Sequence, residues 1–325
     1  MTRVLLPLVL LGGSLAAQAP KTLPPNDQRA RDILEQLINI NTTGPSGSTT
    51  VAANAMAKRL IDAGFPPADV QVIGPEGSKN FNLVARYRGT GSQKPILLLS
   101  HLDVVEARRE DWSMDPFTLV EKDGFFYGRG TLDVKDGDAI LVATLVRLRH
   151  EGYRPNRDLI LALTTGEEGG SDYNGVEWLI KNHRALIDVD YVINMDGGDP
   201  VMLNGKRLMR TVQAAEKVYV TFKLEVRNPG GHSSLPTKDN AIYRLAAALG
   251  RLSGYQFPAQ LNEITRATLR NWAALQQGQL AADLAAVARP TPHTAAIRRL
   301  SHQSPIYNPQ LRTTWLAAGL AGGHA

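Results

Sequence analysis

Side chains that could bind a metal follow three apolar runs of the sequence, PILLLS, LILALTTG and DYVINM. They are His101 and Asp103 after the first run, Glu167 and Glu168 after the second, and Asp196 after the third. If the runs are strands of one open α/β sheet, these side chains meet at the carboxyl edge, where such sheets build their sites. Imidazole and carboxylate ligands suit Zn²⁺, and Co²⁺ or Mn²⁺ could occupy the same geometry.

The His-Leu-Asp order at the end of the first run places His101 and Asp103 on one face of an extended chain, because side chains alternate along a strand. A carboxylate in that position could orient the imidazole of a metal-binding histidine. The alternative is a capped strand end that leaves both side chains on the surface. The motif taken alone does not separate the two.

Glu167 and Glu168 are adjacent acids that repel each other unless cations or a chemical task require both. One could bind a metal while its neighbour takes a proton from water. The alternative is a helix N-terminus, where acidic residues are favoured.

A glycine-rich loop, GRGTLDVKDGDA, leads into a helix and carries Asp133. The pattern is GxGxxD rather than GxGxxG, and it lacks the GK[ST] ending of a P-loop, which argues against nucleotide binding. The two oxygens of Asp133 could instead bridge two cations. Two zinc ions would bring four positive charges, and Asp133, Glu168, Asp196 and a bridging hydroxide would supply four negative ones.

Amphipathic helices that alternate with short apolar runs must position these side chains. Helical spacing is expected at residues 27–40 and 52–65, and the alternation beyond them predicts a sheet that contains parallel strands and carries helices on both faces. From about residue 218 the pattern changes. Residues 218–228 alternate like a half-exposed strand, residues 240–252 form one amphipathic helix, and residues 273–299 are expected to be helical. The fold class is therefore α/β with a second, smaller α+β domain.

The first residues predict export. Arg3 precedes an apolar stretch, and small residues around position 18 follow it, which is the layout of a cleavable signal peptide at residues 1–19. A transmembrane anchor is the rival interpretation, but glycines interrupt a stretch already short for a bilayer span. We therefore expect a periplasmic or secreted protein with no membrane segment in its mature form. The net charge of +5 comes from scattered basic residues, so no nucleic-acid partner is expected, and with no cysteine the chain forms no disulfide or thiolate site.

The ordered motifs HLDVV, GRGTLDVKDG, GEE and MDGG resemble those of the di-zinc metallopeptidases that include aminoacylase, glutamate carboxypeptidase, succinyl-diaminopimelate desuccinylase and carnosinase-like dipeptidases. The resemblance runs from about residue 27 to the end of the chain. It implies a zinc-peptidase sheet at residues 20–215 and a lid and dimerisation domain at residues 216–325, which could form a homodimer.

By this resemblance, two Zn²⁺ ions have four protein ligands and three further residues assist catalysis. His101 and Asp196 would bind one zinc, Asp133 would bridge, and Glu168 would bind the other. Glu167 would be the general base, Asp103 would orient His101, and His232 in RNPGGHSSLP would stabilise the oxyanion. Without the resemblance, the favoured interpretation of His232 is a turn residue without a catalytic role.

The implied function is zinc-dependent hydrolysis of amide bonds in dipeptides, short peptides or N-acyl amino acids by a metal-bridged hydroxide. In the family resembled, an aspartate at the position of Asp196 accompanies aminopeptidase or dipeptidase activity, which favours a peptide substrate. No GxSxG or HExxH motif supports a serine hydrolase or a zincin.

The resemblance also implies a further stretch of catalytic domain with a last histidine ligand, and the sequence ends without a match to it. We therefore expect a chain that lacks this C-terminal part. The alternative function is that of a truncated, inactive relative that binds peptide or metal without turnover.

Overall fold

The computed structural model describes residues 23–323, apart from residues 45, 198–199, 204 and 233. The chain divides into two units, Met1–Gly197 and Gly198–Ala325. The predicted signal peptide at residues 1–19 lies outside the described residues, and the predicted domain boundaries stay predictions. Within the described part, no helix has both the length and the apolar character that a membrane span requires.

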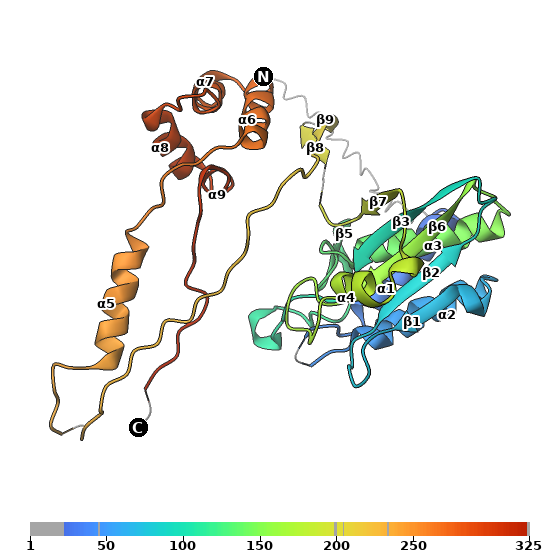
Figure 1. Cartoon of the computed structure of the whole chain (residues 1–325), viewed down its shortest axis with the longest axis horizontal. Helices are drawn as coiled ribbons and strands as arrows, with labels where there is room; N and C mark the ends of the chain where they lie inside the picture. Colours follow the sequence, from blue (N-terminus) through green and yellow to red (C-terminus); the bar gives the residue numbers. More distant parts are fainter. Residues whose placement is uncertain (1–22, 45, 198–199, 204, 233, 324–325) are drawn as a thin grey trace, which may run out of the picture. The chain divides into compact units, whose positions relative to one another are not determined.

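The first unit contains a five-stranded sheet with the order β1-β2-β6-β3-β7 (Figure 1). The central strand pairs, β3 with β6 and β3 with β7, are parallel, whereas β1 and β2 are antiparallel additions. The predicted sheet with parallel strands is therefore confirmed. The strands are β1 (Val70–Ile73), β2 (Asn82–Tyr87), β3 (Gln93–His101), β6 (Arg157–Thr164) and β7 (Tyr191–Asn194).

Strand β6 shows why an apolar run forms the middle of this sheet. Ile160 and Ala162 point into the core cluster on one face, and Leu161 and Leu163 point into the cluster on the other. All four side chains are at most 1% exposed. A strand covered on both faces needs apolar residues at every position, which is why the sequence is continuous rather than alternating there.

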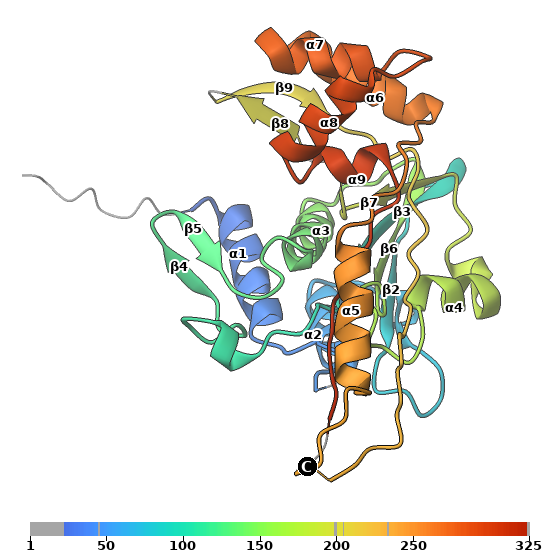
Figure 2. The same cartoon turned by 90° about the vertical axis from the view of Figure 1, so that its left-hand side faces the viewer.

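Helices cover both faces of this sheet, as predicted. Figure 2 shows α1, α2 and α3 on one side of the sheet and α4 on the other. Ile33 and Leu37 of α1 are fully buried in the larger core cluster, whereas Leu179 of α4 packs in the smaller one. The helices are α1 (Pro25–Ile38), α2 (Thr49–Asp62), α3 (Lys135–His150) and α4 (Gly175–Asn182).

Short elements complete the first unit. Strands β4 (Val120–Lys122) and β5 (Phe125–Tyr127) form a hairpin before the glycine-rich loop. The 3-10 turns are η1 (Pro67–Asp69), η2 (Arg109–Asp111) and η3 (Arg184–Leu186).

The second unit combines a hairpin with helices. Strands β8 (Pro200–Leu203) and β9 (Lys206–Arg210) pair with each other. The predicted helix at residues 240–252 is confirmed as α5 (Ala241–Ser253), whose N-cap Asn240 accepts hydrogen bonds from the backbone amides of Ile242 and Tyr243. The helical structure expected at residues 273–299 is confirmed by α7 (Gly278–Val287) and α8 (Thr294–Gln303). Helix α6 (Glu263–Leu275), which lies mostly before that range, was not predicted, and α9 (Tyr307–Leu311) follows α8.

Helices α6 to α9 enclose their own apolar core. Leu269, Leu284, Val287, Leu300 and Leu311 are fully buried there. Burial of one such leucine stabilises a fold by about 1.5–3 kcal/mol, so this cluster is a substantial packing unit.

The predicted strand at residues 218–228 is wrong. These residues lie between β9 and α5 and form no strand in the structure (Figure 1). Tyr219 and Phe222 are 88% and 83% exposed. A strand exists only with a hydrogen-bonded neighbour, and β8 and β9, the described strands of this unit, pair with each other. The sequence of this segment alternates as a strand does, but no described strand pairs with it.

Candidate metal centre

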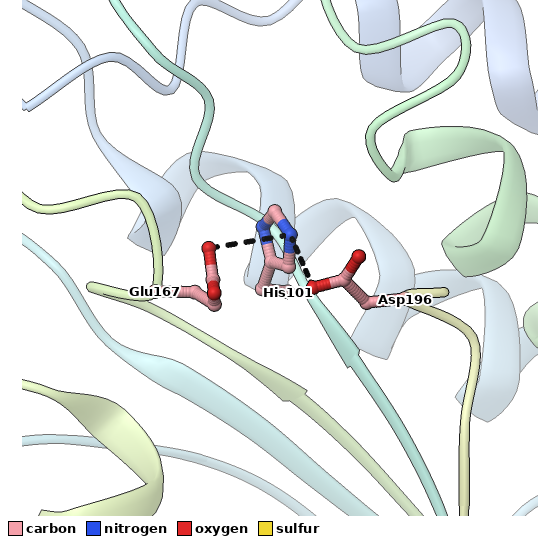
Figure 3. Close-up of side chains that lie close together, drawn as sticks. All are labelled: His101, Glu167 and Asp196. Atoms are coloured by element: carbon pink, nitrogen blue, oxygen red, sulfur yellow. Dashed lines mark ion pairs between the residues drawn. The ribbon is translucent and has the colours of Figure 1, made fainter. Parts of the chain in front are cut away.

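The sheet order brings the three predicted strand ends together. Strand β3 lies between β6 and β7 and runs parallel to both, so all three carboxyl ends meet at one edge. His101 is the last residue of β3, Glu167 lies three residues beyond the end of β6, and Asp196 lies two residues beyond the end of β7. Figure 3 shows the carboxylates of Glu167 and Asp196 on either side of the His101 ring.

His101 is buried, with 3% of its surface exposed. Its Nδ1 lies 3.0 Å from the backbone carbonyl oxygen of Asp103. Because a carbonyl only accepts hydrogen bonds, Nδ1 must donate, which leaves a lone pair on Nε2. Nε2 has no hydrogen-bond partner in the described structure. This is the tautomer that a metal-binding histidine needs.

Carboxylates surround the Nε2 atom of His101. Asp133 Oδ1 lies 3.2 Å from it, and Glu167 Oε2 and Asp196 Oδ2 each lie 3.8 Å from it. One ligand atom each of His101, Glu167 and Asp196 lies within 4.8 Å of the others, as a shared cation requires. The donor set of one imidazole and several carboxylates fits a divalent metal such as zinc. The structure therefore brings His101, Asp133 and Asp196 together, as the sequence predicted.

Asp103 contacts His101 differently from the sequence prediction. Strand β3 ends at His101, so strand alternation does not govern Asp103. The Asp103 carbonyl accepts from the ring, and the closest carboxylate oxygen, Oδ1, lies 3.8 Å from Nδ1. Its other oxygen, Oδ2, accepts a 3.0 Å hydrogen bond from the backbone amide of Glu168. Asp103 thus joins the end of β3 to the loop after β6, and its role as the residue that orients His101 stays a prediction.

Asp133 comes from the glycine-rich loop before α3, and its side chain is 62% exposed. Gly130 in this loop has a φ of +91°, which residues with a Cβ rarely adopt. A Cβ there would lie 2.9 Å from Cδ of Lys135, so the glycine also makes room for that side chain. The loop glycine is explained by its backbone and by Lys135, without a bound phosphate.

The two glutamates after β6 occupy different positions. Gly166 has a φ of +78°, and a Cβ there would lie 2.0 Å from the carbonyl oxygen of Tyr173, so only glycine fits this turn. The turn presents the Glu167 carboxylate to His101. Glu168 does not belong to the group of close ligand atoms found among the described residues. Which glutamate binds metal and which takes a proton stays a prediction.

The charge balance of the centre favours a cation. Burial raises the pKa of the Glu167 carboxyl, and the neighbouring carboxylates of Asp196, Asp103 and Asp133 raise it further. Burial also raises the pKa of the Glu168 carboxyl. For His101, burial lowers the pKa of the ring, but the charge of Asp103 and its carbonyl outweigh burial, so the pKa is raised overall. Neighbouring carboxylates contribute to all three shifts in addition to burial, and a bound cation would offset that negative charge.

Lys135 and Asp138 at the start of α3 are buried charged residues that the sequence prediction missed. Both are 0% exposed. Burial lowers the pKa of the Lys135 ammonium to about 7, and burial raises the pKa of the Asp138 carboxyl to about 7. Lys135 and Asp138 are three residues apart on α3, and the buried Val142 and Leu145 follow on the same face of the helix. That continuity of the apolar stripe was the signal that they face inward.

His232, the predicted oxyanion donor, belongs to the second unit. It is exposed, and its Nδ1 lies 2.8 Å from Ser234 Oγ. Its role toward a substrate stays a prediction.

Comparison with known proteins gives the family. The sequence model of peptidase family M20/M25/M40 matches residues 97–298. The N-fatty-acyl-amino acid synthase/hydrolase PM20D1 of Homo sapiens is 29% identical over 296 residues, which cover 87% of this chain and 57% of that protein. Succinyl-diaminopimelate desuccinylase of Wolbachia pipientis wMel is 31% identical over 231 residues, which cover 70% of this chain and 54% of that protein.

Among solved structures, human carnosine dipeptidase 1 is similar with a TM-score of 0.46 and 21% sequence identity, over 54% of this chain and 41% of that chain. The chain spans about half the length of the curated relatives it matches. The family match covers more than half of the chain and includes every residue of the cluster around His101. The chain therefore belongs to peptidase family M20/M25/M40.

Proposed function

We propose that this protein is a metal-dependent hydrolase that cleaves amide bonds of small peptides or N-acyl amino acids. The observation that carries the proposal is the Nε2 atom of His101. It is buried, has no hydrogen-bond partner in the described structure, and faces carboxylates from three separate loops. Family membership supports hydrolysis as the reaction class.

The proposed centre holds two zinc ions, with cobalt or manganese as alternatives. His101 and Asp196 would bind one ion, Asp133 would bridge, and Glu168 would bind the other. When bound, the ions would lower the pKa of a water molecule and polarise the scissile carbonyl group. They would also offset the negative charge that, together with burial, raises the pKa of Glu167 and Glu168.

Three further residues would assist catalysis. Glu167 would take a proton from the attacking water and return it to the leaving amine. Burial and the neighbouring carboxylates raise the pKa of Glu167, which makes its carboxylate a stronger proton acceptor. Asp103 would fix the His101 ring, and His232 would donate a hydrogen bond to the developing oxyanion.

The substrate class has two lines of support. The relatives named N-fatty-acyl-amino acid synthase/hydrolase and succinyl-diaminopimelate desuccinylase favour an N-acyl amino acid. The aspartate at position 196, by the resemblance described above, favours a dipeptide or short peptide. The amide bond is common to both classes, so a panel of dipeptides and N-acyl amino acids with short and long acyl groups would separate them.

The experiment combines metal counting with turnover. The purified chain is freed of metal, given Zn²⁺, and tested on the panel beside His101→Ala and a matched control, His150→Ala, which changes an exposed histidine of α3. We expect zinc binding and hydrolysis in the wild type and the control, and neither in His101→Ala. Zinc binding without hydrolysis of any substrate would show that the chain is a noncatalytic, metal-binding relative and not an enzyme. No zinc binding at all would refute the centre.

Export and assembly are further parts of the proposal. The pattern at residues 1–19 supports a cleaved signal peptide, and N-terminal sequencing of the mature secreted or periplasmic protein would test it. The exposed apolar side chains at residues 218–228 support a homodimer through the second unit. Light scattering of the purified chain would test it, and a monomer at all concentrations would refute it.

A further inference from the structure

One side of the candidate centre is attached to the chain that leaves α1. The Lys135 ammonium donates hydrogen bonds to the backbone carbonyl oxygens of Leu37 at 2.9 Å and Ile40 at 2.8 Å. Lys135 lies two residues after Asp133, the predicted bridging ligand. The loop that carries Asp133 is therefore fastened to residues 37–43, which we call the 37–43 segment.

The other side of the centre is attached to the same segment. Thr42 Oγ1 donates a 2.7 Å hydrogen bond to the carbonyl oxygen of Leu102, and the Thr42 carbonyl accepts from the amide of Val104 at 3.4 Å. Thr42 is 1% exposed and Leu102 is fully buried. Leu102 directly follows His101, so these bonds hold the end of β3 beside the 37–43 segment.

The attachment of Lys135 is tight. The side chain is fully buried and is the one lysine buried in the described part of the chain. Its stem lies against Gly130, and its backbone amide donates a 3.0 Å hydrogen bond to the Gly130 carbonyl. This bond closes a small loop, and Asp133 lies inside it. Movement of the ammonium would therefore move Asp133.

We propose that the 37–43 segment sets the separation between Asp133 and His101, with Lys135 and Thr42 as positioning residues for the metal centre. The inference rests on the proposed function, because it assumes that both residues bind metal. Neither positioning residue contacts a substrate. They act by holding two ligands, one from the glycine-rich loop and one at the end of β3, at the 3.2 Å distance between Asp133 Oδ1 and His101 Nε2.

A purely structural role is the competing explanation, since Lys135 also satisfies carbonyl groups at the end of α1. The two explanations differ in what they predict for metal affinity. A structural role lowers the stability of the metal-free protein and leaves the affinity of the folded protein for zinc unchanged. A positioning role weakens zinc binding by protein that is still folded.

The test measures zinc affinity of the full chain by competition with a chromophoric chelator. The variants are Lys135→Met, which keeps the apolar stem, and Thr42→Val, which removes one hydroxyl from a side chain of similar shape. Lys58→Met is the matched control, because Lys58 is exposed on α2 and forms an ion pair with Asp62 on the same helix. Urea unfolding of the metal-free proteins and circular dichroism establish that each variant is folded.

We expect Lys135→Met to bind zinc about 10–100-fold more weakly, which is the usual effect of losing a residue that supports metal ligands. Thr42→Val should show a smaller decrease, because the Thr42 backbone hydrogen bond remains, and Lys58→Met should match the wild type. Folded Lys135→Met with wild-type affinity would overturn the inference. If Lys135→Met does not fold, Thr42→Val decides alone, and unchanged affinity in that variant overturns the inference. A wild type that binds no zinc would refute the proposed function first.

Discussion

Two acidic side chains, one in each unit of this protein, have opposite surroundings. In the second unit, Asp283 is 2% exposed, and Arg299 donates two hydrogen bonds to its carboxylate, at 2.8 Å and 2.6 Å. These bonds hold the pKa of Asp283 below its ordinary value. In the first unit, burial and neighbouring carboxylates raise the pKa of Glu167.

The difference lies in where the positive charge comes from. Asp283 has a cation within the chain, whereas no described lysine or arginine forms an ion pair with Asp133, Glu167 or Asp196. A buried acid with its own arginine is a structural pair. A cluster of acids around an unpartnered imidazole nitrogen needs positive charge from outside the chain. The comparison therefore distinguishes a structural ion pair, at Asp283, from a candidate metal centre, at His101.

The largest expected effect comes from Glu167→Gln. Loss of the general base should lower the hydrolysis rate by about 10²–10⁴-fold, while the zinc content stays at the wild-type value. Glu168→Gln is the comparison variant and should instead weaken zinc binding. Rate measurements and metal analysis on the same samples check both. The reverse pattern would exchange the two roles, since Glu167 is the glutamate whose carboxylate the structure groups with His101.

Zinc should stabilise the first unit and not the second. Free zinc at 1,000 times its dissociation constant stabilises a protein by about 4 kcal/mol if only the folded form binds. Hydrogen exchange measured by mass spectrometry can follow β3 and α7 separately with and without a chelator. We expect slower exchange with zinc in β3 and no change in α7. If zinc slowed hydrogen exchange equally in β3 and α7, the proposed difference between the two units would be wrong.

Asp283→Asn should lower the thermal midpoint of the helical cluster in the second unit at pH 7. The hydrogen bonds from Arg299 hold the folded pKa of Asp283 below its ordinary value, so the charged form stabilises the fold above that ordinary pKa. This stabilisation disappears as the pH falls through the folded pKa, and the variant and the wild type should then unfold alike. The effect is moderate because the Arg299 side chain is 49% exposed. Circular dichroism melts across acidic pH test it, and a constant difference at all pH values would argue against the ion pair.

The smallest effect should come from Ile242→Ser on α5. Ile242 is 51% exposed, and α5 has no buried residue in the structure. Such a surface substitution changes the free energy of unfolding by no more than about 0.5 kcal/mol. Chemical denaturation of the purified protein measures it. A much larger loss would show that α5 is covered in solution, for example in the proposed homodimer.

Much of the first unit could be predicted from local patterns. The apolar runs, the helical spacing and the acids at the strand ends all lie within short stretches of sequence. They were sufficient for the α/β class, for the sheet with parallel strands and for the convergence of His101 and Asp196, whereas the place of Asp133 followed from the family resemblance. A parallel sheet places equivalent strand ends at one edge whatever the details of packing.

The alternating residues 218–228 show where local patterns fail. Their alternation met the requirement for a strand, but a strand also needs a neighbour, and the neighbour depends on residues far away in the sequence. The alternation of residues 218–228 carries no information about whether a neighbouring strand is present. The helices α7 and α8 were predictable because the hydrogen bonds of a helix are local.

The sequence by itself determined which residues are available for chemistry and the edge of the sheet where they gather. Only the tertiary structure decided that Glu167 joins His101, that Asp103 contacts the ring through its carbonyl, and that Lys135 is buried against the end of α1. These details depend on turns and on contacts between segments as far apart as α1 and α3. Periodicity specifies which face of an element is apolar, whereas the atoms that meet across elements are fixed only when the whole unit packs.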